Sequence, residues 1–365
     1  METTAAVLRG SESPFGLASL TLADPGPGEV LVRLVATGMC HTDLSMREVH
    51  RDTPWPVVLG HEGAGVIEGL GSAVSGLSLG QPVVLSYNSC GGCRPCQAGT
   101  PNYCDQMWPL NFHCSRLDGS TALSVDGHPV GSHYFGQSSF AAHAVVSARS
   151  VVPVGADVDL TIAGPLGCGV QTGAGAVFNT FDPDPGDALV VFGCGAVGLS
   201  AVLAAVEVGC SPIIGVDIHR SRLDLALDVG ATHAVEAGPD VVSEVLAITH
   251  GRGVDYSFDA VGAVGVLEAA VEVLAPRGLC GLVAAGGPNT KVSLSPRHLI
   301  LGRRVAGIIE GDAVPQVFIP RLLELHRQGR FPFDRLITHF PFAEINEAEA
   351  ASHRGDVIKP VLVMP

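Results

Sequence analysis

Four cysteines lie within fifteen residues, from Cys90 to Cys104, in the sequence CGGCRPCQAGTPNYC. Their spacing is C-x2-C-x2-C-x7-C, and four thiols this close together can form disulfides, bind a metal ion or take part in catalysis. In a reducing compartment, clustered cysteines are more often metal ligands than disulfides. The rest of the chain has to decide among these three roles.

Three further segments each carry one soft metal ligand beside glycines: GMCHTDL (38–44) with Cys40, GHEGAG (60–65) with His61, and PLGCGVQTG (165–173) with Cys168. Two thiolates and one imidazole suit Zn²⁺. Three protein ligands leave a fourth position open for an alcohol, whose hydroxyl pKa the metal lowers. Singly, each residue is more often a buried cysteine or an ordinary turn histidine, so only the joint pattern indicates a catalytic zinc.

A glycine turn, GCGAVG (193–198), fits the pattern G-x-G-x-x-G. Alone this is a weak signal in a chain with 46 glycines, but here it follows an apolar strand and opens a helix. Gly193 makes the tight turn, Gly195 lets backbone amides approach a pyrophosphate, and Gly198 lets helix and strand pack closely. The turn therefore predicts a dinucleotide site.

The next predicted strand ends at Asp217, 24 residues after Gly193. A carboxylate there can accept hydrogen bonds from both hydroxyls of an adenosine ribose and repels a 2′-phosphate, which favours NAD over NADP. The alternative is that Asp217 caps the following helix. Arg220 and Arg222 weaken the exclusion of NADP, because either can reach a phosphate.

The secondary structure that must position these residues differs between the two parts of the chain. The first part has short β-like runs such as EVLVRLVATG (29–38), which predict a barrel-like β region interrupted by the cysteine cluster, a lobe of about residues 88–106. From Asp187 short apolar strands alternate with helices, which predicts an α/β fold with a doubly wound parallel sheet. We expect two domains: residues 169–308 inside a discontinuous domain made of 1–168 and 309–365.

Composition narrows the class of protein. The chain has 365 residues, is 47% hydrophobic and carries a formal net charge of −15, which disfavours nucleic acid and anionic membranes as partners. The N-terminus lacks a basic segment followed by an apolar run, and no uninterrupted apolar stretch is long enough to span a membrane. We therefore expect a soluble protein of the reducing cytoplasm.

The chain resembles the zinc-dependent medium-chain alcohol dehydrogenases over essentially its whole length. The resemblance rests on the sequences and the order of the three ligand segments, the cysteine cluster and the glycine turn. The resemblance implies a GroES-like catalytic domain and a Rossmann domain, two zinc ions per chain, NAD as cofactor, and a homodimer or homotetramer. It also implies that Cys40, His61 and Cys168 hold the catalytic zinc. The clustered cysteines would hold a structural zinc that does no chemistry: Cys90, Cys93, Cys96 and Cys104.

The same resemblance implies roles for neighbours of the catalytic ligands. Thr42 would accept the alcohol proton, Asp43 would orient the zinc-bound imidazole, and Glu62 would approach the metal from behind its ligands. Many members of the family carry a histidine at the outer end of the proton relay, where this chain has Ser45. Because serine is no base near neutral pH, the relay must end at water or another group.

Cofactor contacts are implied in the same way. His41 would meet the pyrophosphate, and Thr172 and Val197 would border the nicotinamide. Lys359 would contact the phosphates, with a solvated surface lysine as the alternative.

The substrate would be a primary alcohol that is oxidised to its aldehyde. The segments PLGCGVQTGAGAV, LNFHCSRLDGS and FGQSSFAAHAVV look most like the benzyl (aryl) alcohol dehydrogenase branch, with Trp55, Trp108 and Phe112 as pocket candidates that can instead belong to the core. The alternatives are a dehydrogenase of allylic terpene alcohols such as geraniol, a thiol-adduct formaldehyde dehydrogenase, a reductase of activated double bonds, and a non-catalytic cofactor-binding protein. The intact zinc ligands and Thr42 argue against the last two.

Overall fold

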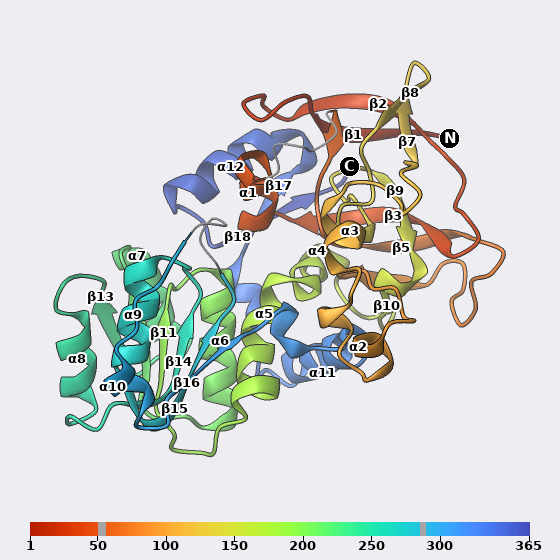
Figure 1. The fold of residues 1–365 in the computed structure, drawn as a ribbon. Coiled ribbons are helices and arrows are strands. Elements are labelled where there is room, and N and C mark those ends of the chain that lie inside the picture. The colour runs from red at the N-terminus through yellow and green to blue at the C-terminus, as the bar shows by residue number, and fades with distance from the viewer. Residues whose placement is uncertain (50–55, 285–289) are drawn as a thin grey trace. The chain divides into compact units, whose positions relative to one another are not determined.

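The computed structural model describes residues 1–49, 56–284 and 290–365, so the pocket candidate Trp55 lies outside the described residues. The chain divides into two compact units (Figure 1). The first unit comprises Met1–Cys168, Val314–Glu324 and Ile337–Pro365. The second unit comprises Gly169–Ala313 and Leu325–Leu336, so residues 309–313 and 325–336 fall with the predicted nucleotide domain rather than with the discontinuous one.

Strand β3 (Glu29–Gly38) is central to the first unit, as its alternating sequence predicts. It pairs antiparallel with β5 (Glu62–Leu70), β9 (His143–Ser147) and β18 (Lys359–Val363). This sheet continues through β6 (Pro82–Leu85), β10 (Val151–Pro153) and β17 (Ile337–Pro341). The pairing of β3 with β18 brings the end of the chain beside the first ligand segment.

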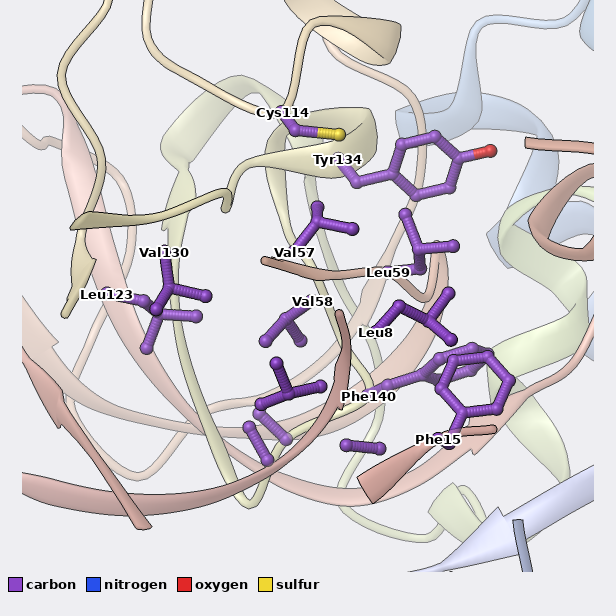
Figure 2. Close-up of a cluster of buried hydrophobic side chains, with 14 of the residues drawn as sticks. Leu8, Phe15, Val57, Val58, Leu59, Cys114, Leu123, Val130, Tyr134 and Phe140 are labelled. Carbon is purple, nitrogen blue, oxygen red and sulfur yellow. The ribbon is translucent and has the colours of Figure 1, made fainter. Parts of the chain in front are cut away.

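A second sheet of the first unit has the strand order β4 (Val57–Val58), β1 (Glu2–Leu8), β2 (Gly16–Leu22), β7 (Leu123–Val125) and β8 (His128–Val130). Buried side chains of this sheet, such as Leu8 and Val130, pack with Tyr134 and Phe140 in the cluster drawn in Figure 2. The helices that lie wholly within this unit are short: α1 (His41–Val49), α2 (Arg94–Gln97), α3 (Met107–Phe112), α4 (Leu160–Ala163) and α12 (Ile345–Arg354).

The second unit contains a parallel sheet of order β13-β12-β11-β14-β15-β16 (Figure 1). Its strands are β11 (Leu189–Phe192), β12 (Ile213–Asp217), β13 (His233–Glu236), β14 (Val254–Asp259), β15 (Leu274–Leu282) and β16 (Arg304–Gly307). The helices are α5 (Gly169–Gly175), α6 (Ala196–Val208), α7 (Arg220–Asp228), α8 (Val241–Ile248), α9 (Val264–Glu272) and α10 (Pro296–Leu299). The strand order reverses at β11, which makes its carboxyl end the expected ligand edge.

The predicted fold class, a Rossmann sheet with a GroES-like β-rich domain, is confirmed, but some element bounds differ. The run GLCGLVAAG (278–286) is typical of a strand, but β15 begins four residues before it, and residues 285–286 of the run lie outside the described residues. The preceding sequence APRG reads as a turn, and it forms an irregularity inside the strand, with Arg277 in the left-handed region (φ 67°). Helix α11 (Pro315–Arg327) is amphipathic, and the boundary between the units after Glu324 falls inside it.

Candidate active site and metal centres

Strand ends bring the three predicted catalytic ligands together within the first unit. Cys40 follows β3, His61 directly precedes β5, and the register of the two strands pairs Gly38 with Glu62. Cys168 follows a 3₁₀ helix, Gly164–Gly167, that packs against both β5 and β6. Three ligands that are far apart in the sequence therefore meet at one end of the sheet.

Two glycines allow Cys168 to come close to the other two ligands. A Cβ at Gly164 would lie 2.2 Å from the carbonyl oxygen of Glu62, and one at Gly167 would lie 1.9 Å from that of Leu85. Ser86 fixes the same turn, because its Oγ donates a 2.6 Å hydrogen bond to the Gly167 carbonyl. Any side chain at either glycine would push Cys168 away from the other two ligands.

The donor set fits a zinc ion. The sulfurs of Cys40 and Cys168, a ring nitrogen of His61 and a carboxylate oxygen of Glu62 all lie within 4.8 Å of one another. His61 is fully buried, and among the described residues its Nε2 has no hydrogen-bond partner. A buried imidazole nitrogen without a partner costs free energy. A metal ion at this position would satisfy Nε2, and these residues are the ones that would hold it.

Asp43 orders this site through the start of α1. Its Oδ2 accepts a 2.9 Å hydrogen bond from the backbone N–H of Cys40, the residue before the helix. Asp43 is the third residue of α1, and this bond is the one that the third residue makes in a capping box. Its Oδ1 lies 2.8 Å from His61 Nδ1 and also accepts from the Gly60 N–H at 3.1 Å. The carboxylate therefore holds the proton of the imidazole on Nδ1 and directs Nε2 toward the sulfurs.

The surroundings of Cys40 favour its thiolate, the form that binds metal. Its pKa lies well below the ordinary value, chiefly because the Cys168 thiol donates a hydrogen bond to it. Burial opposes this shift, whereas the positive charge of Lys359 adds to it.

Glu62 and Lys359 form a buried ion pair behind the ligands. The ammonium lies 2.8 Å and 3.0 Å from the two carboxylate oxygens, and 3.2 Å from the Met39 carbonyl. Burial lowers the pKa of Lys359, but the Glu62 carboxylate and the nearby thiolates of Cys40 and Cys168 together raise it, so the ammonium stays charged. Burial raises the pKa of Glu62, whereas the charge of Lys359 opposes this shift. Lys359 is thus neither a solvated surface lysine nor exposed to cofactor phosphates, which corrects both expectations. Pairing of β18 with β3 buries it.

The hydroxyl of Thr42 lies beside the ligand set, with its Oγ1 3.7 Å from Cys40 Sγ. Thr42 is half-buried, and His41 before it is exposed. Ser45 turns its hydroxyl back to the Thr42 carbonyl, to which it donates at 3.2 Å. Ser45 therefore supports the backbone of Thr42.

Aromatic side chains cover the imidazole. Phe135 stacks on His61 with ring centroids 4.5 Å apart, and Tyr134 contacts it edge-on at 5.6 Å. The predicted pocket residue Phe112 contacts both rings. Trp108 stacks on Phe112 but is 64% exposed, so it lies at the outer side of this group. Sequence reasoning missed Tyr134 and Phe135, although FGQSSFAAHAVV begins at Phe135.

The four clustered cysteines form a second set, with all four sulfurs within 4.8 Å of one another. All ten cysteines of the chain are free thiols. Backbone amides surround the cluster: the N–H of Cys93 donates to Cys90 Sγ at 3.3 Å, and that of Gln106 donates to Cys104 Sγ at 3.3 Å. The Gly92 amide is the main reason why the pKa of Cys90 falls to about 6. Four sulfurs with amide donors fit a closed tetrahedral zinc site.

The glycine turn of the second unit has the geometry that its motif predicts. Gly193 is left-handed (φ 91°), and a Cβ at Gly198 would lie 1.8 Å from the Gly193 carbonyl. Gly195 precedes α6 and offers no side chain to cap it, so the first amides of the helix can meet an anion. Helix α5 lies close beside α6, because Gly173 packs on the carbonyl of Val197. This contact places Thr172 and Val197 on neighbouring helices.

Asp217 ends β12 next to this turn and is almost completely buried. Its Oδ2 accepts from the Cys194 N–H at 2.7 Å, and its Oδ1 accepts from the His219 N–H at 2.8 Å. Arg222 approaches Oδ2 to 3.9 Å. The carboxylate thus braces the glycine turn rather than capping the amides of α7.

Comparison with known proteins agrees with this architecture. Residues 26–156 match the alcohol dehydrogenase GroES-like domain, and residues 196–326 match the zinc-binding dehydrogenase family. A geraniol dehydrogenase of Castellaniella defragrans is 46% identical over 364 residues, which cover 98% of this chain and 97% of that protein.

Two solved structures share the fold over its whole length. One is an alcohol dehydrogenase zinc-binding domain protein from Burkholderia ambifaria, with a TM-score of 0.97 and 47% identity, covering 100% of this chain and 99% of that one. The other is the benzyl alcohol dehydrogenase from Acinetobacter calcoaceticus, with a TM-score of 0.96 and 41% identity over 100% of both chains. Similarity of this extent, in a chain whose predicted ligands converge, means that the protein belongs to the zinc-dependent medium-chain alcohol dehydrogenases.

Proposed function

We propose that this protein oxidises unsaturated primary alcohols, with benzylic (aryl) alcohols preferred, to their aldehydes, and that NAD accepts the hydride. The observation that carries the proposal is the convergence of Cys40, His61 and Cys168 beside the hydroxyl of Thr42. Three ligands leave one zinc position open for the alcohol. The reaction is reversible, so the same site reduces the aldehydes.

Cys40, His61 and Cys168 would hold the zinc ion, whose charge would lower the pKa of the alcohol hydroxyl. Thr42 would accept the alcohol proton and pass its own hydroxyl proton on to water or another group, and its Oγ1 lies 3.7 Å from Cys40 Sγ. Asp43 holds the His61 tautomer that leaves Nε2 free for the metal. The Glu62–Lys359 pair places a buried carboxylate and a compensating ammonium behind the ligands. Together, these residues keep charge balanced while a proton leaves the alcohol.

NAD is favoured by Asp217. Each of its oxygens accepts one backbone N–H and retains capacity for a further hydrogen bond, so both can receive a ribose hydroxyl. Its negative charge disfavours a 2′-phosphate, although Arg222 lies close enough to moderate this effect. The free amides at the start of α6 would bind the pyrophosphate, with His41 as a further contact.

The preference for unsaturated alcohols rests on the aromatic side chains around His61, with Phe112 behind them. It also rests on the benzyl alcohol and geraniol dehydrogenases among the relatives. The 46% identity to the geraniol dehydrogenase makes an allylic terpene alcohol the second candidate substrate.

We also propose a homodimer or homotetramer in the cytoplasm. The edge strand β16 and its neighbourhood expose apolar side chains that a second copy would cover, namely Leu299, Ile300, Leu301 and Val305. Ten free thiols suit a reducing compartment. Among the helices of residues 1–49, 56–284 and 290–365, none has the length and apolar character needed to cross a membrane.

The test is a panel of benzyl, cinnamyl, terpene and short aliphatic alcohols, each measured with NAD and with NADP. We expect kcat/KM for benzylic and allylic alcohols to exceed that for ethanol by at least about 10-fold, because each buried apolar group adds transition-state binding. Benzyl alcohol should exceed geraniol. Equal or better turnover of ethanol would overturn the substrate proposal, and preference for NADP would overturn the cofactor proposal.

A further inference from the structure

Tyr134 belongs to the apolar core of the first unit but directs its polar end to the active site. The residue is fully buried in the cluster that also contains Leu59 and Phe140. Figure 2 shows its phenol oxygen pointing away from the aliphatic side chains of that cluster. The hydroxyl donates a 3.2 Å hydrogen bond to the carbonyl of Thr42. A buried phenol with one backbone acceptor therefore holds the residue that carries the reactive hydroxyl.

The turn that carries Tyr134 has an unusual backbone. His133, Phe135 and Ser138 have φ values of 66°, 52° and 55°, in the left-handed region where side chains other than glycine are disfavoured. Such conformations cost about 1 kcal/mol or more each and persist where the surroundings fix them, which occurs most often at functional sites. Three within six residues indicate that the position of this turn is under strong constraint.

Side chains of the turn anchor it to the strand that begins at the zinc ligand. Gln137 donates to the carbonyl of His61 at 2.9 Å and accepts from the Gly63 N–H at 3.1 Å. Ser138 accepts from the Tyr134 N–H at 2.9 Å and donates to the Val58 carbonyl at 2.7 Å. The turn is thus bonded to the backbone on both sides of His61.

At its other end the turn is anchored by charge. His133 Nε2 lies 2.9 Å from Glu29 Oε1, and Arg116 binds the same carboxylate at 2.7 Å and 2.9 Å. Glu29 begins β3, the strand that leads to Cys40. One turn therefore touches the start of the strand before Cys40, the backbone around His61, and Thr42.

We propose that Tyr134 is a positioning residue that fixes the proton-accepting hydroxyl of Thr42 relative to the imidazole of His61. The inference rests on the proposed function of Thr42. The phenol binds the main chain of Thr42 while the edge of its ring contacts His61, so one rigid side chain sets the spacing between proton acceptor and metal ligand. Ser45 binds the same carbonyl and supports this arrangement.

Tyr134→Phe keeps the ring and its packing but removes the hydrogen bond to Thr42. We expect the rate of hydride transfer in a single turnover to fall about 5-fold, as for the loss of one such bond, while KM changes little. Ser45→Ala, which removes the other side-chain donor to this carbonyl, should lower the same rate by a smaller factor. Tyr256→Phe in the second unit is the matched control and should leave the rate unchanged.

A double-mutant cycle with Thr42→Val separates positioning from a general loss of structure. Valine keeps the backbone carbonyl but removes the hydroxyl, so in this background Tyr134→Phe and Ser45→Ala should each change the rate by less than about 2-fold. The same 5-fold loss in both backgrounds would overturn the inference while leaving the role of Thr42 intact.

A wild-type rate in Thr42→Val itself would contradict the proposed function of Thr42 and the inference with it. Zinc content and Tm are measured for each variant. A loss of zinc from Tyr134→Phe would overturn the inference, because the residue would then serve to hold the metal site. If Tyr134→Phe does not fold, the Ser45→Ala arm of the cycle decides.

Discussion

The two metal-binding groups of the first unit differ in how the chain builds them. The four-cysteine lobe is local: its ligands lie within fifteen residues, and neighbouring backbone amides stabilise the sulfurs. The catalytic group is assembled from residues as far apart as Cys40 and Cys168. The pairing of the end of β3 with the start of β5 brings Cys40 to His61, and the 3₁₀ helix Gly164–Gly167, which packs on β5 and β6, adds Cys168. In the proposed function, four sulfurs would close one zinc site, whereas three ligands would leave the other open. A local site can stabilise a lobe, and an assembled one can bind substrate.

The substitution with the largest expected effect removes a ligand of the catalytic group and leaves the four-cysteine lobe unchanged. Cys168→Ser removes a thiolate ligand, and kcat/KM should fall on the order of 1,000-fold or more. The reason is that a metal charge beside the alcohol oxygen stabilises the transition state by several kcal/mol. The four-cysteine lobe should keep its metal, so the variant should stay folded with one zinc per chain. Activity assays, circular dichroism and elemental analysis check this. Unfolding of the variant would contradict the division of roles.

The complementary change is made in the local site. Cys96→Ser opens the tetrahedron of the lobe, and structural zinc contributes directly to folding free energy. We expect Tm to fall by roughly 10 °C. Protein kept well below the new Tm should retain most of its activity. If Cys96→Ser abolished activity at unchanged Tm, the four-cysteine site would have to take part in the chemistry.

A smaller effect concerns the cofactor and should leave both metal sites alone. Asp217→Ala removes the acceptor for the ribose hydroxyls and the repulsion of a 2′-phosphate, so the ratio of kcat/KM for NAD to that for NADP should fall about 10- to 100-fold. Zinc content should stay at the wild-type value. An unchanged ratio would remove Asp217 from cofactor selection.

The smallest expected effect concerns the release of the alcohol proton from the catalytic group. A histidine titrates near pH ~6.5 and can accept a proton at neutral pH, where serine cannot. Because Ser45→His and Ser45→Ala both lose the hydrogen bond to the Thr42 carbonyl, the alanine variant is the reference for the histidine. If proton release is partly limiting, Ser45→His should exceed Ser45→Ala in kcat about 3-fold at pH ~7 and by much less at pH ~9, where hydroxide competes. The solvent isotope effect should fall with it. A flat ratio of the kcat of Ser45→His to that of Ser45→Ala would show that proton release through this position does not limit the rate.

The same contrast between local and assembled structure explains what the sequence could predict. Strand β3, the glycine turn and the cysteine lobe follow from periodicity and spacing within short segments, and each lies where it was expected. The contacts of Tyr134 and Phe135 were not predictable, because Gln137 and Ser138 hold their left-handed turn through bonds to residues more than 70 positions away. Lys359 was misread because a lysine near the C-terminus gives no sign that pairing of β18 with β3 will bury it beside Glu62.

Zinc content tests the central claim most directly. The account requires two zinc ions per chain, one in the local site and one in the assembled site. Elemental analysis of wild-type protein purified without chelator should give two per chain. A value of one or none would contradict the account.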